Sequence, residues 1–65
     1  MVGELRELRL NAGASSEDDG KLVFVMGENF YHDNLTGFKI YTCIKEGREC
    51  NYSETFLARS SVRIA

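Results

Sequence analysis

The sequence predicts a mainly β domain, with three to four antiparallel strands in a meander that follows a short N-terminal helix or extended arm. Two runs at residues 21–25 and 38–44 are rich in β-branched and aromatic residues, which is the composition of strands. Glycine-containing polar clusters separate these runs, as turns separate the strands of a meander. The chain contains no proline, and only residues 2–10 show leucines at a helical spacing.

The first 20 residues differ in composition from the rest, so we expect an N-terminal arm with a polar acidic loop (1–20) and a small β module (21–65). Leu5 and Leu8 are three residues apart, which suits a helix, whereas Leu8 and Leu10 would share one face of a strand. Both conformations stay open for the arm. The core is expected to form mainly within the β module.

Three turn clusters divide the β module into strands. Each cluster contains a glycine, which can adopt the positive φ that tight hairpin turns require. The clusters lie at residues 26–29, 34–37 and 45–48, and they are followed by a continuing strand at 49–58 and by a final strand or tail at 59–65.

The third turn also predicts a strand register. A two-residue loop at Glu46 and Gly47 would align a cysteine pair, an aromatic pair and an ion pair across the two strands. The aromatic and ionic pairs are of the kind that stabilises neighbouring strands. The aligned pairs are Cys43 with Cys50, Tyr41 with Tyr52, and Lys39 with Glu54.

A second two-residue loop at Gly27 and Glu28 would pair Val25 with Phe30 and leave both faces of the sheet apolar. One face would carry Val23, Val25, Phe30, Tyr41 and Tyr52, and the other would carry Leu22, Phe24, Met26, Tyr31, Phe38 and Ile40. The N-terminal leucines can cover one face, and the other needs a partner because large exposed apolar patches promote association. The residues expected to contact that partner are Phe24, Met26, Tyr31, Phe38 and Ile40.

Length and charge exclude several classes of protein. A chain of 65 residues forms one domain, and a core of that size rarely supplies more than about 3–5 kcal/mol. The formal net charge is −2, which does not favour a nucleic-acid binder. No run approaches the roughly 20 apolar residues of a membrane span, and the charged N-terminal segment does not resemble a signal peptide. A nucleic-acid-binding alternative would use Lys45, Arg48, Arg59 and Arg63.

Cys43 and Cys50 can be metal ligands, disulfide partners or buried thiols, and the sequence leaves these three states open. Two thiolates are half of the four ligands that a structural zinc ion requires, and no CxxC pair supplies the rest. We therefore expect no cofactor, with zinc as the alternative. A bridged pair, together with glycosylation sequons at Asn34 and Asn51, would indicate an extracellular or viral module.

Catalysis is not expected. His32 is the single histidine, and in the predicted register it lies opposite Lys39, four residues along the strand from Cys43. At about 3.3 Å per residue that separation is too large for a nucleophile and its base to share a hydrogen bond.

Residues 20–50 resemble the FLYWCH-type zinc-finger module of chromatin-associated proteins. The family's order is a polar segment with a glycine, an apolar run, a glycine–aromatic turn, a strand rich in Tyr and Phe, and two cysteines. The matching elements are Ser15-Ser16 with Gly20, Leu22-Val23-Phe24, Gly27, Phe30-Tyr31, Tyr41-Thr42-Cys43 and Cys50. Tyr41 stands in the place of the family's Trp, and its terminal His-x-His is missing here. The resemblance implies a small antiparallel sheet in a nuclear, partner-binding protein.

The sequence thus predicts a non-catalytic protein-interaction module that self-associates or binds a protein partner through an apolar sheet face, with no membrane contact. The alternatives are a degenerate zinc-finger-like nucleic-acid binder and a disulfide-linked extracellular or viral module. The first alternative implies that nucleic-acid binding weakens as the salt concentration rises. The second implies that a thiol assay finds no free thiol.

Overall fold

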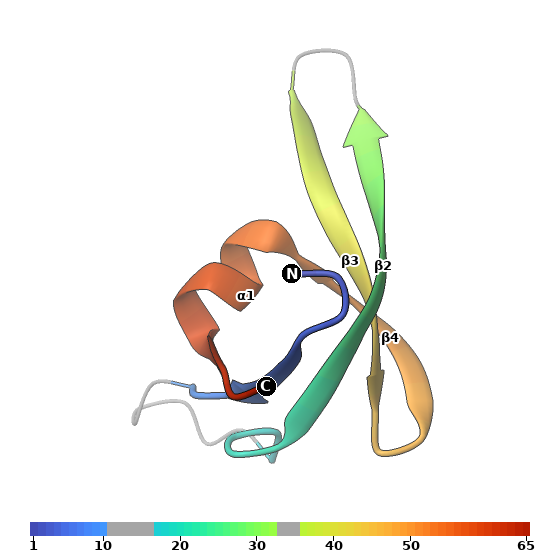
Figure 1. Cartoon of the computed structure of the whole chain (residues 1–65). Coiled ribbons are helices and arrows are strands. Elements are labelled where there is room, and N and C mark those ends of the chain that lie inside the picture. The colour runs from blue at the N-terminus through green and yellow to red at the C-terminus, as the bar shows by residue number, and fades with distance from the viewer. Residues whose placement is uncertain (11–16, 33–35) are drawn as a thin grey trace.

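The computed structural model describes residues 1–10, 17–32 and 36–65, which form one antiparallel sheet with a short helix on one side (Figure 1). The five strands lie in the order β4-β3-β2-β1-β5. Their bounds are β1 (Leu5–Leu8), β2 (Leu22–His32), β3 (Gly37–Lys45), β4 (Arg48–Ser53) and β5 (Ser61–Arg63), and the helix α1 is Glu54–Ser60. The predicted mainly β class is confirmed. No helix in the described part of the chain has the length and apolarity needed to cross a membrane.

The N-terminal segment is a strand of this sheet. β1 lies between β2 and β5, with Leu5 opposite Phe24 and Leu8 opposite Ser61. Leu8 is completely buried, while Leu5 belongs to the other face of the sheet because side chains alternate along a strand. Of the two predicted conformations for the arm, the extended one is therefore present, and its pairing raises the number of strands to five.

The turn predicted at residues 26–29 is wrong. β2 continues through this segment, and its register against β3 shifts between Val25 and Gly27, so that Met26 forms a bulge. A bulge accommodates one extra residue in a strand, and the strand continues in the same direction on both sides of it. The predicted pairing of Val25 with Phe30 is wrong for the same reason. The turn predicted at 34–37 lies mostly outside the described residues.

The β3–β4 hairpin has the predicted register, with Cys43 opposite Cys50 and Tyr41 opposite Tyr52. The two loop residues, Glu46 and Gly47, have φ angles of 54° and 74°. Positive φ at both central positions is the geometry of a type I′ turn, whose twist matches that of the paired strands.

Helix α1 replaces the strand that was expected to continue through residues 49–58. Ser53 ends β4 and caps the helix, since its side chain accepts a hydrogen bond of 3.1 Å from the backbone N–H of Phe56. Leu57 is the buried residue of α1, and it packs in a core made of side chains from the same face of the sheet. The buried core residues are Leu8, Val23, Val25, Tyr41, Cys43 and Leu57. The N-terminal leucines were expected to cover this face; Leu8 instead joins the core from within the sheet, and α1 is the cover.

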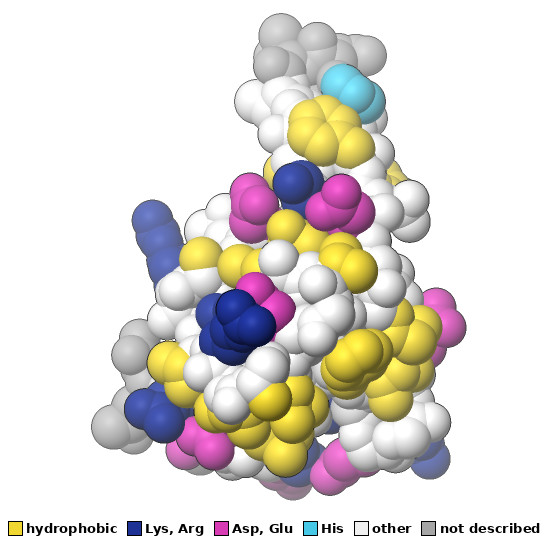
Figure 2. Space-filling view, viewed as in Figure 1, with side chains coloured by type: hydrophobic (Ala, Val, Ile, Leu, Met, Phe, Trp, Pro, Cys, Tyr) yellow, Lys and Arg dark blue, Asp and Glu magenta, His cyan; other side chains and the backbone are white. Residues whose placement is uncertain are grey.

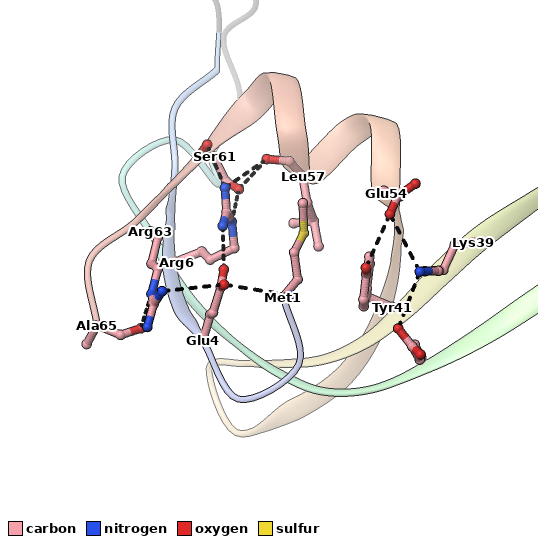
Figure 3. A network of polar contacts seen from close by, with 11 residues as sticks. Met1, Glu4, Arg6, Lys39, Tyr41, Glu54, Leu57, Ser61, Arg63 and Ala65 are labelled. Atoms are coloured by element: carbon pink, nitrogen blue, oxygen red, sulfur yellow. Dashed lines mark hydrogen bonds and ion pairs between the residues drawn. The ribbon is translucent and has the colours of Figure 1, made fainter.

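Polar contacts fasten α1 and the two chain ends to β1 (Figure 3). Arg6 donates from Nε to the Ser61 hydroxyl at 2.7 Å, and that hydroxyl donates to the Leu57 carbonyl at 2.5 Å. Arg6 also donates to Glu4 at 2.6 Å, and this hydrogen bond is the main reason that the pKa of Glu4 is lowered. The packing of α1 removes water from the Arg6 guanidinium group, and these partners supply the hydrogen-bond acceptors that replace it.

Candidate functional site

The face of the sheet opposite α1, called here the open face, is largely apolar. Leu5, Phe24 and Ile44 are directly opposite one another on β1, β2 and β3, so they form a row across its centre. Tyr31 is opposite Phe38 further along β2 and β3, and the two rings stack with centroids 5.8 Å apart. Paired residues share one face of a sheet, so the row and the stacked rings belong to a single surface.

Four of the five predicted contact residues lie on the open face at paired positions, and the fifth occupies the bulge. Large side chains on this surface are close to half exposed, from 44% for Phe24 and Met26 to 60% for Tyr31. Leu22 and Phe38 are 46% and 47% exposed. Leu5 and Ile44 were missing from the predicted contacts. Ile44 follows Phe38, Ile40 and Thr42 at every second position of β3, so the alternation of faces indicates it. Leu5 follows in the same way once β1 is assigned as a strand.

Among the described residues, β2 and β3 present no charge on the open face. The described open-face positions of β2 and β3 are Leu22, Phe24, Gly27, Asn29, Tyr31, Phe38, Ile40, Thr42 and Ile44. Carboxylates on this face lie on the two flanking strands, at Glu7 of β1 and Glu49 of β4. A neutral apolar stripe of this kind favours contact with another apolar surface over contact with charged polymers.

The outer parts of β2 and β3, residues 28–32 and 37–39, form a hairpin that protrudes beyond the other strands (Figure 1). On the face turned away from the open face, Phe30 contacts His32 edge-on, with ring centroids 4.6 Å apart. The Phe30 ring also covers Gly37, where an added Cβ would lie 2.6 Å from Cε1 of that ring. The protruding hairpin therefore carries exposed aromatic side chains on both faces.

At the base of the protruding hairpin, Lys39 lies between two carboxylates (Figure 3). Its ammonium group is 3.7 Å from Glu28 and 3.8 Å from Glu54, and the Coulombic attraction of Glu28 is the largest cause of its raised pKa. The Tyr41 hydroxyl donates to Glu54 at 3.4 Å. Figure 2 shows hydrophobic side chains and the histidine on the hairpin, above a basic group flanked by acidic ones. A hollow of about 330 Å³ here is lined by Glu28, Asn29, Phe30 and Lys39.

The basic residues of the nucleic-acid alternative do not form one patch. Lys45 and Arg48 are opposite each other at the end of the β3–β4 hairpin, whereas Arg63 is in β5 at the other edge of the sheet. Arg59 is at the end of α1, near β5. The four cations thus occupy two separate edges.

Lys45 is also engaged within the protein. Its ammonium group lies 2.8 Å from the Tyr52 hydroxyl and 2.9 Å from Asp18, and these hydrogen bonds raise its pKa. Asp18 has a lowered pKa, mainly because of Lys45 and then Lys21. A phosphate group would therefore compete with these internal partners for Lys45.

Cys43 and Cys50 face each other with both thiols free. Cys43 is fully buried, and burial raises its pKa to about 11. His32 does not supply a third ligand, since it is opposite Gly37 near the tip of the protruding hairpin; the predicted position opposite Lys39 is wrong. Among the described residues, no group of three or more His, Cys, Asp or Glu side chains is arranged to hold a metal ion.

Comparison of the chain with protein-family models, curated proteins and solved structures gives no match.

Proposed function

We propose that this chain is a non-catalytic protein-interaction module that self-associates by packing its open face against the open face of a second copy. The observation that carries the proposal is the neutral apolar stripe along β2 and β3, half-exposed from Leu22 to Tyr31. Helix α1 covers the opposite face, and within the described part of the chain the open face is the large apolar surface of the sheet that lacks a cover.

The size of the stripe suits a dimer interface. About half of each of five large side chains corresponds to roughly 500 Å² of apolar surface per copy. A standard interface buries about 800 Å² per partner, and homodimer interfaces are about 65% apolar, so the stripe supplies the apolar share that such an interface needs. The five side chains are Leu22, Phe24, Met26, Tyr31 and Phe38.

A second copy also suits the chemistry of the stripe. Two sheets pack face to face at about 10 Å, with side chains of both inner faces interdigitating. In a two-fold arrangement the same patch meets itself, so a neutral stripe meets a neutral stripe and no buried charge is left unpaired. The protruding hairpin extends the contact, because Tyr31 and Phe38 continue the same surface.

Sedimentation velocity between about 1 µM and 1 mM tests the proposal. We expect the wild-type chain to pass from monomer to dimer within this range. Phe24→Asp places a carboxylate in the centre of the stripe, where dimerisation would bury it, so this variant should stay monomeric. Circular dichroism of the variant checks that the sheet still forms.

Tyr31→Asp and Phe30→Asp provide a matched pair for the same experiment. The two residues are adjacent in the protruding hairpin and have similar exposures of 60% and 57%, but they lie on opposite faces. Tyr31→Asp should weaken dimerisation, and Phe30→Asp should leave it unchanged. A wild-type chain that stays monomeric at about 1 mM, or equal effects of the two variants, would refute self-association through the open face.

Placement of this module in a chromatin-associated protein is a further part of the proposal, and its support is the FLYWCH-type sequence resemblance alone. Fluorescence microscopy of a tagged chain tests that part, and exclusion from the nucleus would contradict it.

A further inference from the structure

We propose that Cys43 and Cys50 are a reversible dithiol–disulfide pair, which a low-molecular-weight disulfide such as oxidised glutathione converts into an internal cross-strand link. The inference does not depend on the open face. It starts from the register of the β3–β4 hairpin, which places the two cysteines directly opposite each other. Opposed residues of antiparallel strands have Cα atoms about 4.5–5.5 Å apart, within the range that disulfides span.

Several contacts hold this register. The type I′ turn at Glu46 and Gly47 sets the alignment of the two strands. Lys45 reaches across to the Tyr52 hydroxyl at 2.8 Å and lies over its ring, 5.5 Å from the centroid. A slip of one residue would move a cysteine to the other face and break these contacts, so the two thiols stay juxtaposed.

The difference in burial gives the two cysteines different roles. Cys50 is in the edge strand β4 and is half-buried, so a small disulfide can reach it. Cys43 lies opposite it on the inner strand β3 and is fully buried in the core. The Cys50 thiolate attacks one sulfur of oxidised glutathione, forms a mixed disulfide and releases one glutathione thiolate. The Cys43 thiolate then attacks the Cys50 sulfur and releases the second, so two protein thiols are oxidised and one oxidised glutathione is reduced to two thiols.

The described residues do not add further metal ligands to the cysteine pair. Zinc would need two more donors, and the described side chains around the pair do not provide a third. The Cys43 thiol donates a weak hydrogen bond to the Tyr41 carbonyl at 3.9 Å. Two juxtaposed thiols without further ligands are suited to forming a disulfide.

The test is to equilibrate the whole chain with reduced and oxidised glutathione at several ratios, quench it with an alkylating reagent and measure its mass. At oxidising ratios we expect the mass of a single chain that has lost two hydrogens and carries no alkyl group. Under excess reduced glutathione both thiols should return. The thermal midpoint should be higher in the oxidised form. Chains linked to each other, stable glutathione adducts on the wild type, or thiols that persist at every ratio would overturn the proposal.

Single substitutions test the order of the two steps. Cys43→Ser removes the resolving thiol, so the glutathione adduct should accumulate on Cys50. Cys50→Ser leaves only the buried thiol, which should remain unmodified in the folded chain. Modification of Cys50→Ser at the same rate as Cys43→Ser would contradict the assigned roles, and far-ultraviolet circular dichroism confirms that both variants are folded.

Discussion

Leu57 is the buried side chain that α1 packs into the core. Its truncation gives a quantitative test of the fold. Leu57→Ala removes three carbon atoms from a site with no solvent exposure. At about 0.8 kcal/mol per methylene the transfer cost is roughly 2.4 kcal/mol, and the cavity left behind raises the total to about 2–5 kcal/mol. A small single core supplies about 3–5 kcal/mol, so the variant should be largely or wholly unfolded at 25 °C.

Leu22→Ala is the matched control, because it makes the same chemical change on the open face. Leu22 is 46% exposed, so in the monomer its truncation should cost about 1 kcal/mol. Urea unfolding followed by circular dichroism, at a concentration where the chain is monomeric, measures the cost for Leu22→Ala. For Leu57→Ala the circular dichroism signal without urea shows how much of the chain is still folded. Leu57→Met, which conserves volume, should stay folded and cost less than about 1.5 kcal/mol.

The Leu22 and Leu57 variants separate folding from association. Leu22→Ala should weaken dimerisation while leaving the monomer folded. Leu57→Ala should lose dimerisation only because the chain unfolds, and Leu57→Met should dimerise like the wild type. Equal losses of unfolding free energy in the two alanine variants would refute the division of the sheet into a core face and an open face.

The remaining predictions concern the α1 cap and the buried thiol. Ser53→Ala should lower the free energy of unfolding by about 1 kcal/mol, because the N–H of Phe56 loses its acceptor, while Thr55→Ala should change it by less than about 0.5 kcal/mol; equal effects in urea unfolding would contradict the cap. Burial raises the pKa of Cys43 from 9.0 to about 11. Between these two pH values the folded state keeps a proton that the unfolded chain releases, so the free energy of unfolding should fall by about 2–3 kcal/mol as the pH rises from 9.0 to about 11. Cys43→Ala should make this fall smaller in denaturant titrations at several pH values. The part that remains belongs to lysines and tyrosines with raised pKa values, such as Lys45 and Tyr41, which act with the same sign; an unchanged fall in the variant would contradict a buried neutral thiol.

The division of apolar residues between the two faces was predicted correctly although one of the turns behind it was not. The sequence-based register assumed a loop at Gly27 and Glu28, which would place Val25 and Phe30 on one face as a pair. The structure keeps them on one face of a single strand, because the bulge at Met26 shifts the alternation by one residue. Both arrangements place Val25 and Phe30 on the same face, so four of the five predicted contact residues share the open face, and Met26 occupies the bulge.

Helix α1 was missed for a reason of scale. Seven residues make a helix that has marginal stability by itself, and its aromatic and β-branched residues have low helix propensity. The signal was the Ser53–Glu54 pair, a good N-cap followed by an acidic first turn. Burial of Leu57 and the contacts of Arg6 with Ser61 stabilise the helix once the sheet is present.

Local chemistry determined the β3–β4 hairpin from the sequence alone, because a two-residue turn fixes the alignment of every pair that follows it. That alignment brought Cys43 to Cys50 and Tyr41 to Tyr52. Only the tertiary structure decided the bulge in β2, the place of β1 between β2 and β5, and the cover that α1 provides. These features depend on contacts between segments far apart in the chain, and their free energy comes from burial that no local pattern contains.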